Sequence, residues 1–478
     1  MKRNIISLII RPTLLVLMLL PLVAVAKPSY KITLQVDGNN DSAMLLCFYY
    51  AQSERIVDTA FNNGKGRFVF EGDEELKPGL YFFTNNKNRY VEFVIYNEKP
   101  NFQFHTDDRG WTMNMKVKGS RQNEIFFNYQ RASESLYQEI ETAKSTMDSA
   151  SLAEFTHKQH LRVDSLKLAM IEHYPDAMIS KMMLAVKNID EEVPTHKSDG
   201  SEMSQRERYD YYMLHYFDHI PLDDNFIVRT PKPVFYKHVM DYVEKKMRGM
   251  PPAMICPLLD SMIDRSEKAP EVFKWLIFTL TNHYLQSNVM VYDEVYVHLV
   301  QRYFTTGKAG FFLDPSTVDE QVARANKWEH LLVGREAPEL ILFDTNHYAY
   351  SLHRMRGDYT LLVFWSPTCG HCRDIIPAVY KVFEEYSDSI NMTAFTILSE
   401  PDEVTVGKWK KFINEHNMHS PRWVHLNGGE ANVDWREVYD ITTTPQIYLI
   451  DNKDHTFIAK KLNANILREI CRNITKQQ

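Results

Sequence analysis

The chain has 478 residues, which is too long for one ordinary hydrophobic core and predicts about three domains. Hydrophobic residues make up 44% of the chain and charged residues 24%, which excludes a disordered or fibrous protein. The formal net charge of -7 comes from well-mixed charges, so the sequence has neither an acidic tail nor a basic surface for nucleic acid.

Residues 1–26 have the pattern of a secretory signal peptide. Basic residues stand near the start, an apolar run extends from Leu14 to Val25, and Ala24-Val25-Ala26 is a small-residue pattern that signal peptidase cuts. An uncleaved membrane anchor is the alternative, but the apolar run is well short of the roughly 20 residues that a spanning helix needs. We therefore predict a protein that is periplasmic or otherwise exported to the cell envelope, with no transmembrane segment after signal cleavage.

Short strands are predicted throughout residues 27–118. The apolar segments are KITLQV, AMLLCFYY, RFVFEG, GLYFF, RYVEFVI, NFQFH and MNMKVKG, and turn residues such as NNGKG, KPG and NEKP separate them. Several short strands between turns indicate a β-sandwich-like domain. This stretch holds no catalytic constellation, so binding or docking is its default role.

Residues 119–325 are predicted to form an all-α domain. The apolar period changes to that of helices after Gly119, and Ser120 is placed to cap the first helix. Further helical patterns lie at 151–173, 176–188, 204–218, 233–247, 255–265, 270–286 and 290–304. No motif assigns a role to residues 27–325, for which partner recognition or assembly is the expectation.

Residues 326–478 alternate between strand and helix patterns. Strands are predicted at 340–343, 359–365, 392–398, 422–426, 446–451 and 456–461, and helices at 371–386, 403–416 and 465–475. Such alternation indicates an α/β layer structure, in which chemistry gathers where strands end. The segment CGHC lies at such a place, between the strand YTLLVFW and a helix.

Cys369 and Cys372 stand three positions apart, whereas the other three cysteines of the chain have no local partner. A zinc site would need two more ligands, and no second C-x-x-C exists, so no metal is expected. A structural disulfide in so small a ring is strained and labile. A redox pair fits best: a helix N-terminus and His371 favour the Cys369 thiolate, and Cys372 can then attack a mixed disulfide formed at Cys369.

The segment FWSPTCGHCRDIIP resembles the active-site segment of the thioredoxin superfamily, with Phe-Trp before the cysteines and Pro377 after them. TTTPQIYLID resembles the family's second hallmark, a cis-proline facing the disulfide, which would be Pro445. The backbone of the preceding residue, here Thr444, pairs with an extended substrate in the family. VGREAPELILFDTNHYAYSLHRMRGDYTLLVFW resembles the opening of the TlpA/ResA-like branch. The resemblance implies a C-terminal thioredoxin fold, and the branch is exported, in agreement with the signal peptide.

The sequence departs from the family at three positions. Val363 stands where thioredoxin has a buried Asp, Thr368 replaces the tryptophan before the first cysteine, and Ile375 replaces a frequent Glu. Proton transfer must then come from His371, Asp374, water or a remote group. A thiol peroxidase is disfavoured, because Leu362 stands where its pattern requires a proline.

We therefore predict an exported thiol-disulfide oxidoreductase that exchanges a Cys369–Cys372 dithiol or disulfide with protein substrates and with a membrane or envelope redox partner. No cofactor, metal or nucleic acid is expected. The predicted catalytic residues are Cys369, Cys372 and His371, and the predicted substrate groove contains Trp365, Thr444 and Pro445. The alternative is a redox-quiet envelope binding or scaffolding protein that uses the thioredoxin domain for docking. The direction of electron flow, the substrate and the oligomeric state stay open.

Overall fold

The computed structural model describes residues 28–85, 89–187 and 189–477, and the chain divides into two compact units. The first comprises residues up to 48 together with 54–178, and the second comprises 49–53 and the residues from 179 onward. The predicted signal peptide, residues 1–26, lies outside the described residues. Within the described ranges no helix is long and apolar enough to cross a membrane. The domain boundaries predicted near 118 and 325 stay predictions.

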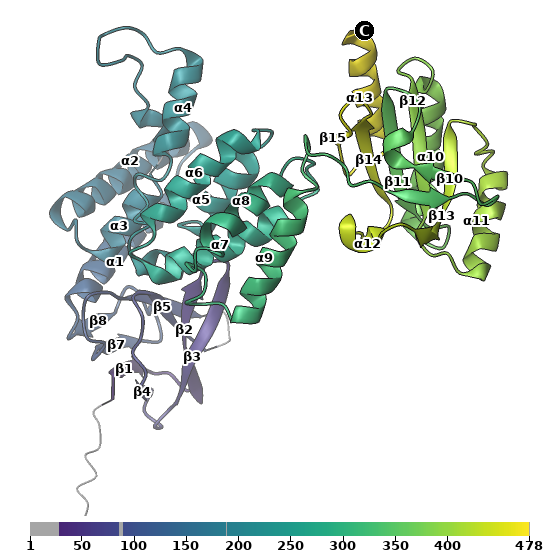
Figure 1. Cartoon of the computed structure of the whole chain (residues 1–478). Helices are drawn as coiled ribbons and strands as arrows, with labels where there is room; N and C mark the ends of the chain where they lie inside the picture. The colour runs from purple at the N-terminus through teal and green to yellow at the C-terminus, as the bar shows by residue number, and fades with distance from the viewer. Residues whose placement is uncertain (1–27, 86–88, 188, 478) are drawn as a thin grey trace, which may run out of the picture. The chain divides into compact units, whose positions relative to one another are not determined.

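Two four-stranded sheets form the N-terminal region (Figure 1). One has the order β4-β1-β7-β8, with bounds Arg67–Gly72, Tyr30–Asp37, Gln103–Asp107 and Lys116–Lys118. The other has the order β3-β2-β5-β6, with bounds Ser53–Phe61, Ala43–Tyr50, Gly79–Thr84 and Tyr90–Ile95. Buried rings join the two sheets, since Phe83 lies 5.3 Å from Phe70 and 5.6 Å from Phe104 between ring centres. The predicted β-sandwich is confirmed.

Helix α1 (Arg121–Lys144) begins where the sequence predicts, because the Ser120 hydroxyl accepts a hydrogen bond from the Asn123 backbone N–H at 3.1 Å. The Asn123 side chain is fully buried and attaches the helix to strand β6. Its oxygen accepts from the Val94 N–H at 2.8 Å, and its amide nitrogen donates to the Val94 carbonyl at 2.7 Å. Helix α2 (Ser149–His173) then packs against α1.

The helical part of the second unit runs from α3 to α9. Its α-helices are Met178–Ala185, Gln205–His215, Tyr236–Asp241, Pro252–Arg265, Pro270–Leu285, Asp293–Tyr303 and Pro315–Glu329. The helix predicted at 233–247 is the short α5 continued by a π-helical turn, Tyr242–Lys246. The last helix, α9, is missing from the sequence prediction, in which the helices of this domain end at residue 304. It crosses the predicted boundary near 325, and Asp314 caps its start by accepting from the Thr317 N–H at 3.0 Å.

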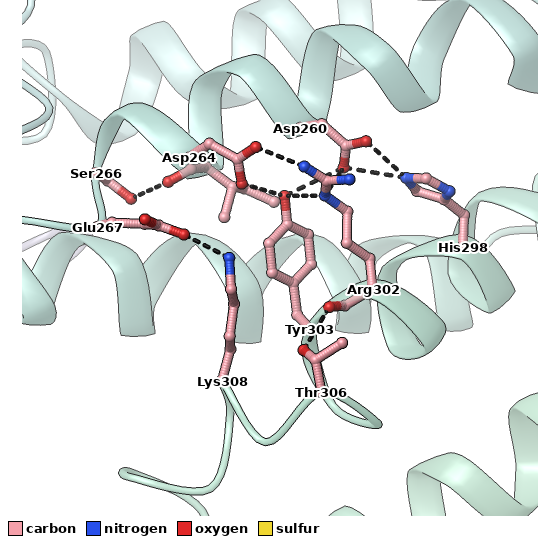
Figure 2. A network of polar contacts seen from close by, with 10 residues as sticks. Asp260, Asp264, Ser266, Glu267, His298, Arg302, Tyr303, Thr306 and Lys308 are labelled. Carbon is pink, nitrogen blue, oxygen red and sulfur yellow. Dashed lines mark hydrogen bonds and ion pairs between the residues drawn. The ribbon is translucent and has the colours of Figure 1, made fainter.

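A polar network joins helices α6 and α8 (Figure 2). Asp260 accepts from His298 at 3.0 Å and pairs with Arg302 at 3.2 Å, and Arg302 also pairs with Asp264 at 2.6 Å. The fully buried Tyr303 places its hydroxyl 3.1 Å from both carboxylates. Burial raises the pKa of Tyr303, so the hydroxyl stays protonated and can donate. Since each carboxylate already faces a cation, the network is a structural link between the helices.

A seven-stranded sheet forms the C-terminal region, with the order β10-β9-β13-β12-β11-β14-β15. In that order the strands are Ala349–Ser351, Ile341–Phe343, Trp423–Ala431, Met392–Leu398, Tyr359–Trp365, Gln446–Asp451 and Thr456–Ala459. The central strand β11 runs parallel to β12 and antiparallel to β14. All residues of β12, and all but Tyr359 in β11, are buried, which explains why continuous apolar runs predicted both strands correctly.

Helices cover both faces of this sheet. Helices α10 (Gly370–Tyr386), α11 (Glu403–Glu415) and α13 (Ala464–Gln477) contribute side chains to the core on one face. The short helix α12 (Trp435–Val438) contributes to the core on the other. In Figure 1 these elements surround the strands of the green and yellow part of the chain. This is the predicted C-terminal α/β thioredoxin fold.

Candidate functional site

Three chain segments meet at one edge of the seven-stranded sheet. Strands β11 and β12 are parallel and end in register, with Trp365 opposite Leu398. Strand β14 is antiparallel to β11 and begins at Gln446, opposite Phe364. The residues that follow β11, those that follow β12 and those that precede β14 therefore lie side by side.

Cys369 lies at this edge as the N-cap residue of α10 and is half-buried. Its thiol lies 3.2 Å from the backbone oxygen of Thr444, to which it can donate a hydrogen bond. The Thr444–Pro445 peptide bond is cis, as the resemblance predicts. Cys372, one helical turn on, is fully buried, and both thiols are free. The structure thus brings together four of the six predicted site residues, namely Cys369, Cys372, Thr444 and Pro445.

The two cysteines differ in acidity. Burial pushes the pKa of Cys369 upward, but hydrogen bonds from the Cys372 backbone and thiol, from Thr444 and from the His371 backbone outweigh it and leave the pKa below its usual value. Burial raises the pKa of Cys372 to about 12, although the Ser366 backbone opposes this shift. The arrangement therefore presents one thiolate-prone sulfur and one protonated sulfur within one turn of helix.

The two other predicted site residues take different places. His371 is exposed in the first turn of α10. Its backbone amide, and not its ring, is among the groups that lower the pKa of Cys369. Trp365 is fully buried and packs against Phe412, with 5.3 Å between ring centres. We therefore correct the prediction that Trp365 lines a substrate groove. It faces the core beneath the motif, because side chains alternate along β11 and this one points to the α10 face.

A group of three polar residues beside the cysteines has no counterpart in the sequence prediction. Ser366 and Thr368 place their hydroxyls 2.9 Å and 2.5 Å from the same carboxylate oxygen of Glu400, and the two hydroxyls lie 2.7 Å apart. These hydroxyls lower the pKa of Glu400, so the carboxylate is ionised at neutral pH. The sequence signal that could have found Glu400 is its place just after β12, a parallel neighbour of β11.

Among the described residues no group of three or more His, Cys, Asp and Glu side chains could hold a metal ion. Val363, which stands in the place of thioredoxin's buried acid, is itself fully buried among apolar side chains. The chemistry that the site offers is therefore that of two neighbouring thiols of unequal acidity, next to a backbone acceptor.

Comparisons with known proteins divide the chain into three matched parts. Residues 30–126 match a domain of unknown function, DUF4369, and residues 180–320 match another, DUF5106. Residues 333–455, which contain both cysteines and Pro445, match the AhpC/TSA family. No known activity therefore comes with the first two parts.

Relatives with curated names each resemble a part of the chain. The thioredoxin-like protein YneN of Bacillus subtilis (strain 168) is 28% identical over 121 residues, which are 25% of this chain and 66% of YneN. The thiol-disulfide oxidoreductase YkuV of the same organism is 32% identical over 65 residues, 14% of this chain and 44% of YkuV. The chain thus covers less than two thirds of the length of either relative.

One solved structure resembles the chain over a longer stretch than these two relatives do. A thioredoxin-like protein from Bacteroides caccae ATCC 43185 is 18% identical, with a TM-score of 0.47, over 59% of this chain and 97% of that one.

Proposed function

We propose that this chain exchanges disulfides with protein substrates in the cell envelope. The proposal starts from residues 333–455, which form a thioredoxin-like domain of the AhpC/TSA family that is homologous to thiol-disulfide oxidoreductases. The observation that carries the proposal is the unequal acidity of the two neighbouring thiols. Cys369 has a lowered pKa and is partly accessible, whereas Cys372 is buried and its pKa is raised to about 12. Cys369 is thus the nucleophile and Cys372 the resolving thiol.

The exchange proceeds in two steps. In the reducing direction, the Cys369 thiolate attacks one sulfur of a substrate disulfide, forms a mixed disulfide, and releases the other substrate sulfur as a thiolate that takes a proton. Cys372 then loses its proton and attacks the Cys369 sulfur, and the bond between Cys369 and the substrate breaks. Two electrons have passed from the cysteine pair to the substrate, and the pair is left as a disulfide. The reverse sequence oxidises a substrate dithiol.

The surroundings of Cys369 support a protein substrate. The backbone oxygen of Thr444 faces the thiol at 3.2 Å, so an extended peptide that reaches the sulfur also reaches the backbone beside Pro445. Thr444, Pro445 and Gln446 are each half-buried, which leaves part of this segment open to a partner. A second, membrane or envelope redox partner would return the pair to its starting state.

Export is the remaining part of the proposal, and it rests on the signal-peptide pattern of residues 1–26. Mass spectrometry of the protein from a cell-envelope fraction should find a mature chain that begins at Lys27. A chain that keeps residue 1 and stays in the cytoplasm would contradict export without affecting the chemistry.

The activity is tested by reduction of a model protein disulfide, such as insulin, with dithiothreitol as the electron source. The wild-type chain should accelerate the reaction, Cys369→Ser should abolish the acceleration, and Cys372→Ser should accumulate a mixed disulfide. Cys47→Ala, which removes a buried thiol of β2, is the matched control and should act like wild type. Equal rates for wild type and Cys369→Ser would reject the oxidoreductase in favour of the scaffolding alternative.

A further inference from the structure

The loop of residues 366–368 leads from the end of β11 to Cys369, the N-cap residue of α10, and hydrogen bonds within the loop fix its shape. The Ser366 carbonyl accepts from the Cys369 N–H at 3.2 Å, and the Ser366 hydroxyl accepts from the Thr368 N–H at 3.2 Å. Only 1% of Ser366 is exposed. The buried start of the loop is therefore tied directly to the backbone of the nucleophile.

Glu400 holds this loop by its side chain. One oxygen of its carboxylate lies 2.5 Å from the Thr368 hydroxyl and 2.9 Å from the Ser366 hydroxyl, and each hydroxyl can donate to it. These hydroxyls lower the pKa of Glu400, so the carboxylate is ionised at neutral pH. Hydrogen bonds to an ionised carboxylate are about twice as strong as neutral ones. Both ends of the loop are therefore bound to one charged oxygen.

The backbone that carries Glu400 is itself fixed to the sheet. Strand β12 ends at Leu398, opposite Trp365 of β11, and the next residue, Ser399, donates its N–H to the Trp365 carbonyl at 2.8 Å. The Ser399 carbonyl accepts from the Arg436 guanidinium. Glu400 thus stands on a held segment at the end of β12, and the loop that follows β11 is bound to it.

We propose that Glu400 is a positioning residue for disulfide exchange, which holds the loop of residues 366–368 so that the Cys369 sulfur stays at the start of α10, beside the Thr444 carbonyl. The proposal rests on the proposed function, since it assigns a role in the first attack on the substrate disulfide. Glu400 takes and gives no proton in that step. A carboxylate that follows β12 thereby places the nucleophile that follows β11.

The acidity of Cys369 depends on this placement. Burial pushes the pKa of Cys369 upward, and hydrogen bonds from the first turn of α10 and from Thr444 outweigh that effect. These bonds and the positive end of the helix dipole act at short range, so a sulfur that moves away from them becomes less acidic. The charge of Glu400 has the opposite effect, because a neighbouring negative charge disfavours a thiolate. Loss of Glu400 should therefore raise the pKa of Cys369 if its role is positioning, and lower it if its role is charge.

The pH dependence of Cys369 alkylation separates these two roles. Reduced protein is labelled with iodoacetamide from acid to alkaline pH, and mass spectrometry of the peptides gives the rate at Cys369. Below the pKa of Cys369, Glu400→Ala should react about fivefold more slowly than wild type, the effect of losing about one hydrogen bond. At alkaline pH, where the thiolate is fully formed, the two rates should agree within about twofold. Glu400→Gln should react at least as fast as wild type, because its amide oxygen still accepts from both hydroxyls and its charge is gone.

Further variants separate the contact from the folding of the chain. Thr368→Val, at an exposed position, removes one of the two hydroxyls and should slow labelling by a smaller factor than Glu400→Ala. The double variant should be no slower than Glu400→Ala alone, because that change already breaks the contact. Glu415→Ala is the matched control. It removes an exposed carboxylate of α11, paired with Lys411 at 3.6 Å, and should leave the labelling rate unchanged.

Faster labelling in Glu400→Ala than in wild type would overturn the positioning role in favour of a charge effect. Equal slowing by Glu400→Ala and Glu400→Gln would also overturn it, as would wild-type rates in both Glu400→Ala and Thr368→Val. Because alkylation needs no disulfide exchange, its result is independent of the insulin assay. A wild-type chain that leaves insulin oxidised, in a series whose labelling rates follow the expected order, would reject the proposed function and support the placement of Cys369 by Glu400.

Discussion

The thiol of Cys369 lies 3.2 Å from the backbone oxygen of Thr444, which is 75 positions further along the chain. The contact exists because β14, which follows Thr444–Pro445, pairs antiparallel with β11, which leads into Cys369. The Cys369 sulfur is thereby placed beside the half-buried residues 444–446, with which a peptide substrate would pair in the proposed function. The fold therefore couples the position of the thiol to that of the backbone at Thr444 and Pro445.

Alkylation should distinguish the two site cysteines. At pH 7 iodoacetamide should modify Cys369 first, because its pKa lies below the usual thiol value, and the rate should fall as the pH is lowered through that pKa. Cys372 should resist, because it is fully buried and its pKa is about 12. Mass spectrometry of the labelled peptides measures both rates, and the chain in denaturant, where the two should react alike, is the control. Faster labelling of Cys372 in the folded protein would reverse the assigned roles.

Asn123→Ala should destabilise the N-terminal unit by about 2–4 kcal/mol, because it leaves the buried Val94 N–H and carbonyl without partners and opens a small cavity. Asn128→Ala on the same helix is the matched control. Asn128 is exposed and accepts only from Arg131, at 2.6 Å, so its loss should cost less than about 0.5 kcal/mol. Denaturant unfolding followed by circular dichroism compares them, and equal costs would contradict the role given to Asn123.

Tyr303→Phe should destabilise the helical region by about 1–3 kcal/mol. The change removes the hydroxyl that lies 3.1 Å from both Asp260 and Asp264 in the network of Figure 2, and it leaves these partly buried carboxylates with one donor fewer. Tyr348→Phe, at a residue that is 68% exposed, should be nearly neutral. Thermal unfolding of the two variants tests this. A Tyr303→Phe protein as stable as wild type would show that the hydroxyl is replaceable by water.

His425 should make the C-terminal domain less stable in acid. Burial lowers its pKa to about 4, and its ring nitrogen lies 2.8 Å from the Met418 carbonyl. The unfolded chain takes up the proton at about pH 6.5, so the stability held above that pH is lost as the pH falls from about 6.5 to about 4, by at most about 1.4 kcal/mol per pH unit.

Unfolding free energies measured across that range should show the loss in wild type and a smaller one in His425→Gln, which has no titrating ring. His347→Gln is the control, since 82% of that side chain is exposed, and it should keep the wild-type dependence. A wild-type slope in His425→Gln would assign the acid sensitivity to other groups.

Local patterns predicted the C-terminal domain well because its central strands are buried on both faces. The predicted bounds 359–365, 392–398 and 446–451 are those of β11, β12 and β14. Strand β3 escaped prediction because most of its side chains are exposed, which leaves no apolar pattern. Helix α9 was not predicted, because the predicted domain boundary near residue 325 falls inside it.

The site residues that stand in local sequence motifs were predictable. Those that reach the site only through the pairing of strands were not. Cys369, Cys372 and Pro445 stand in recognisable motifs, and the structure brings them together. Glu400 reaches the site only because β12 runs parallel to β11, a relationship that no local stretch of sequence contains. Trp365 was misplaced because the motif does not say which face of β11 its side chain takes.

Equilibration of the chain with glutathione buffers of graded potential shows whether Cys369 and Cys372 form a reversible redox pair. Mass spectrometry after alkylation then counts the free thiols at each potential. We expect a single two-electron transition between a dithiol and a Cys369–Cys372 disulfide, which is lost in Cys369→Ser and in Cys372→Ser and kept in Cys47→Ala. Two thiols that stay free at every potential, or a transition that persists in Cys369→Ser, would contradict it.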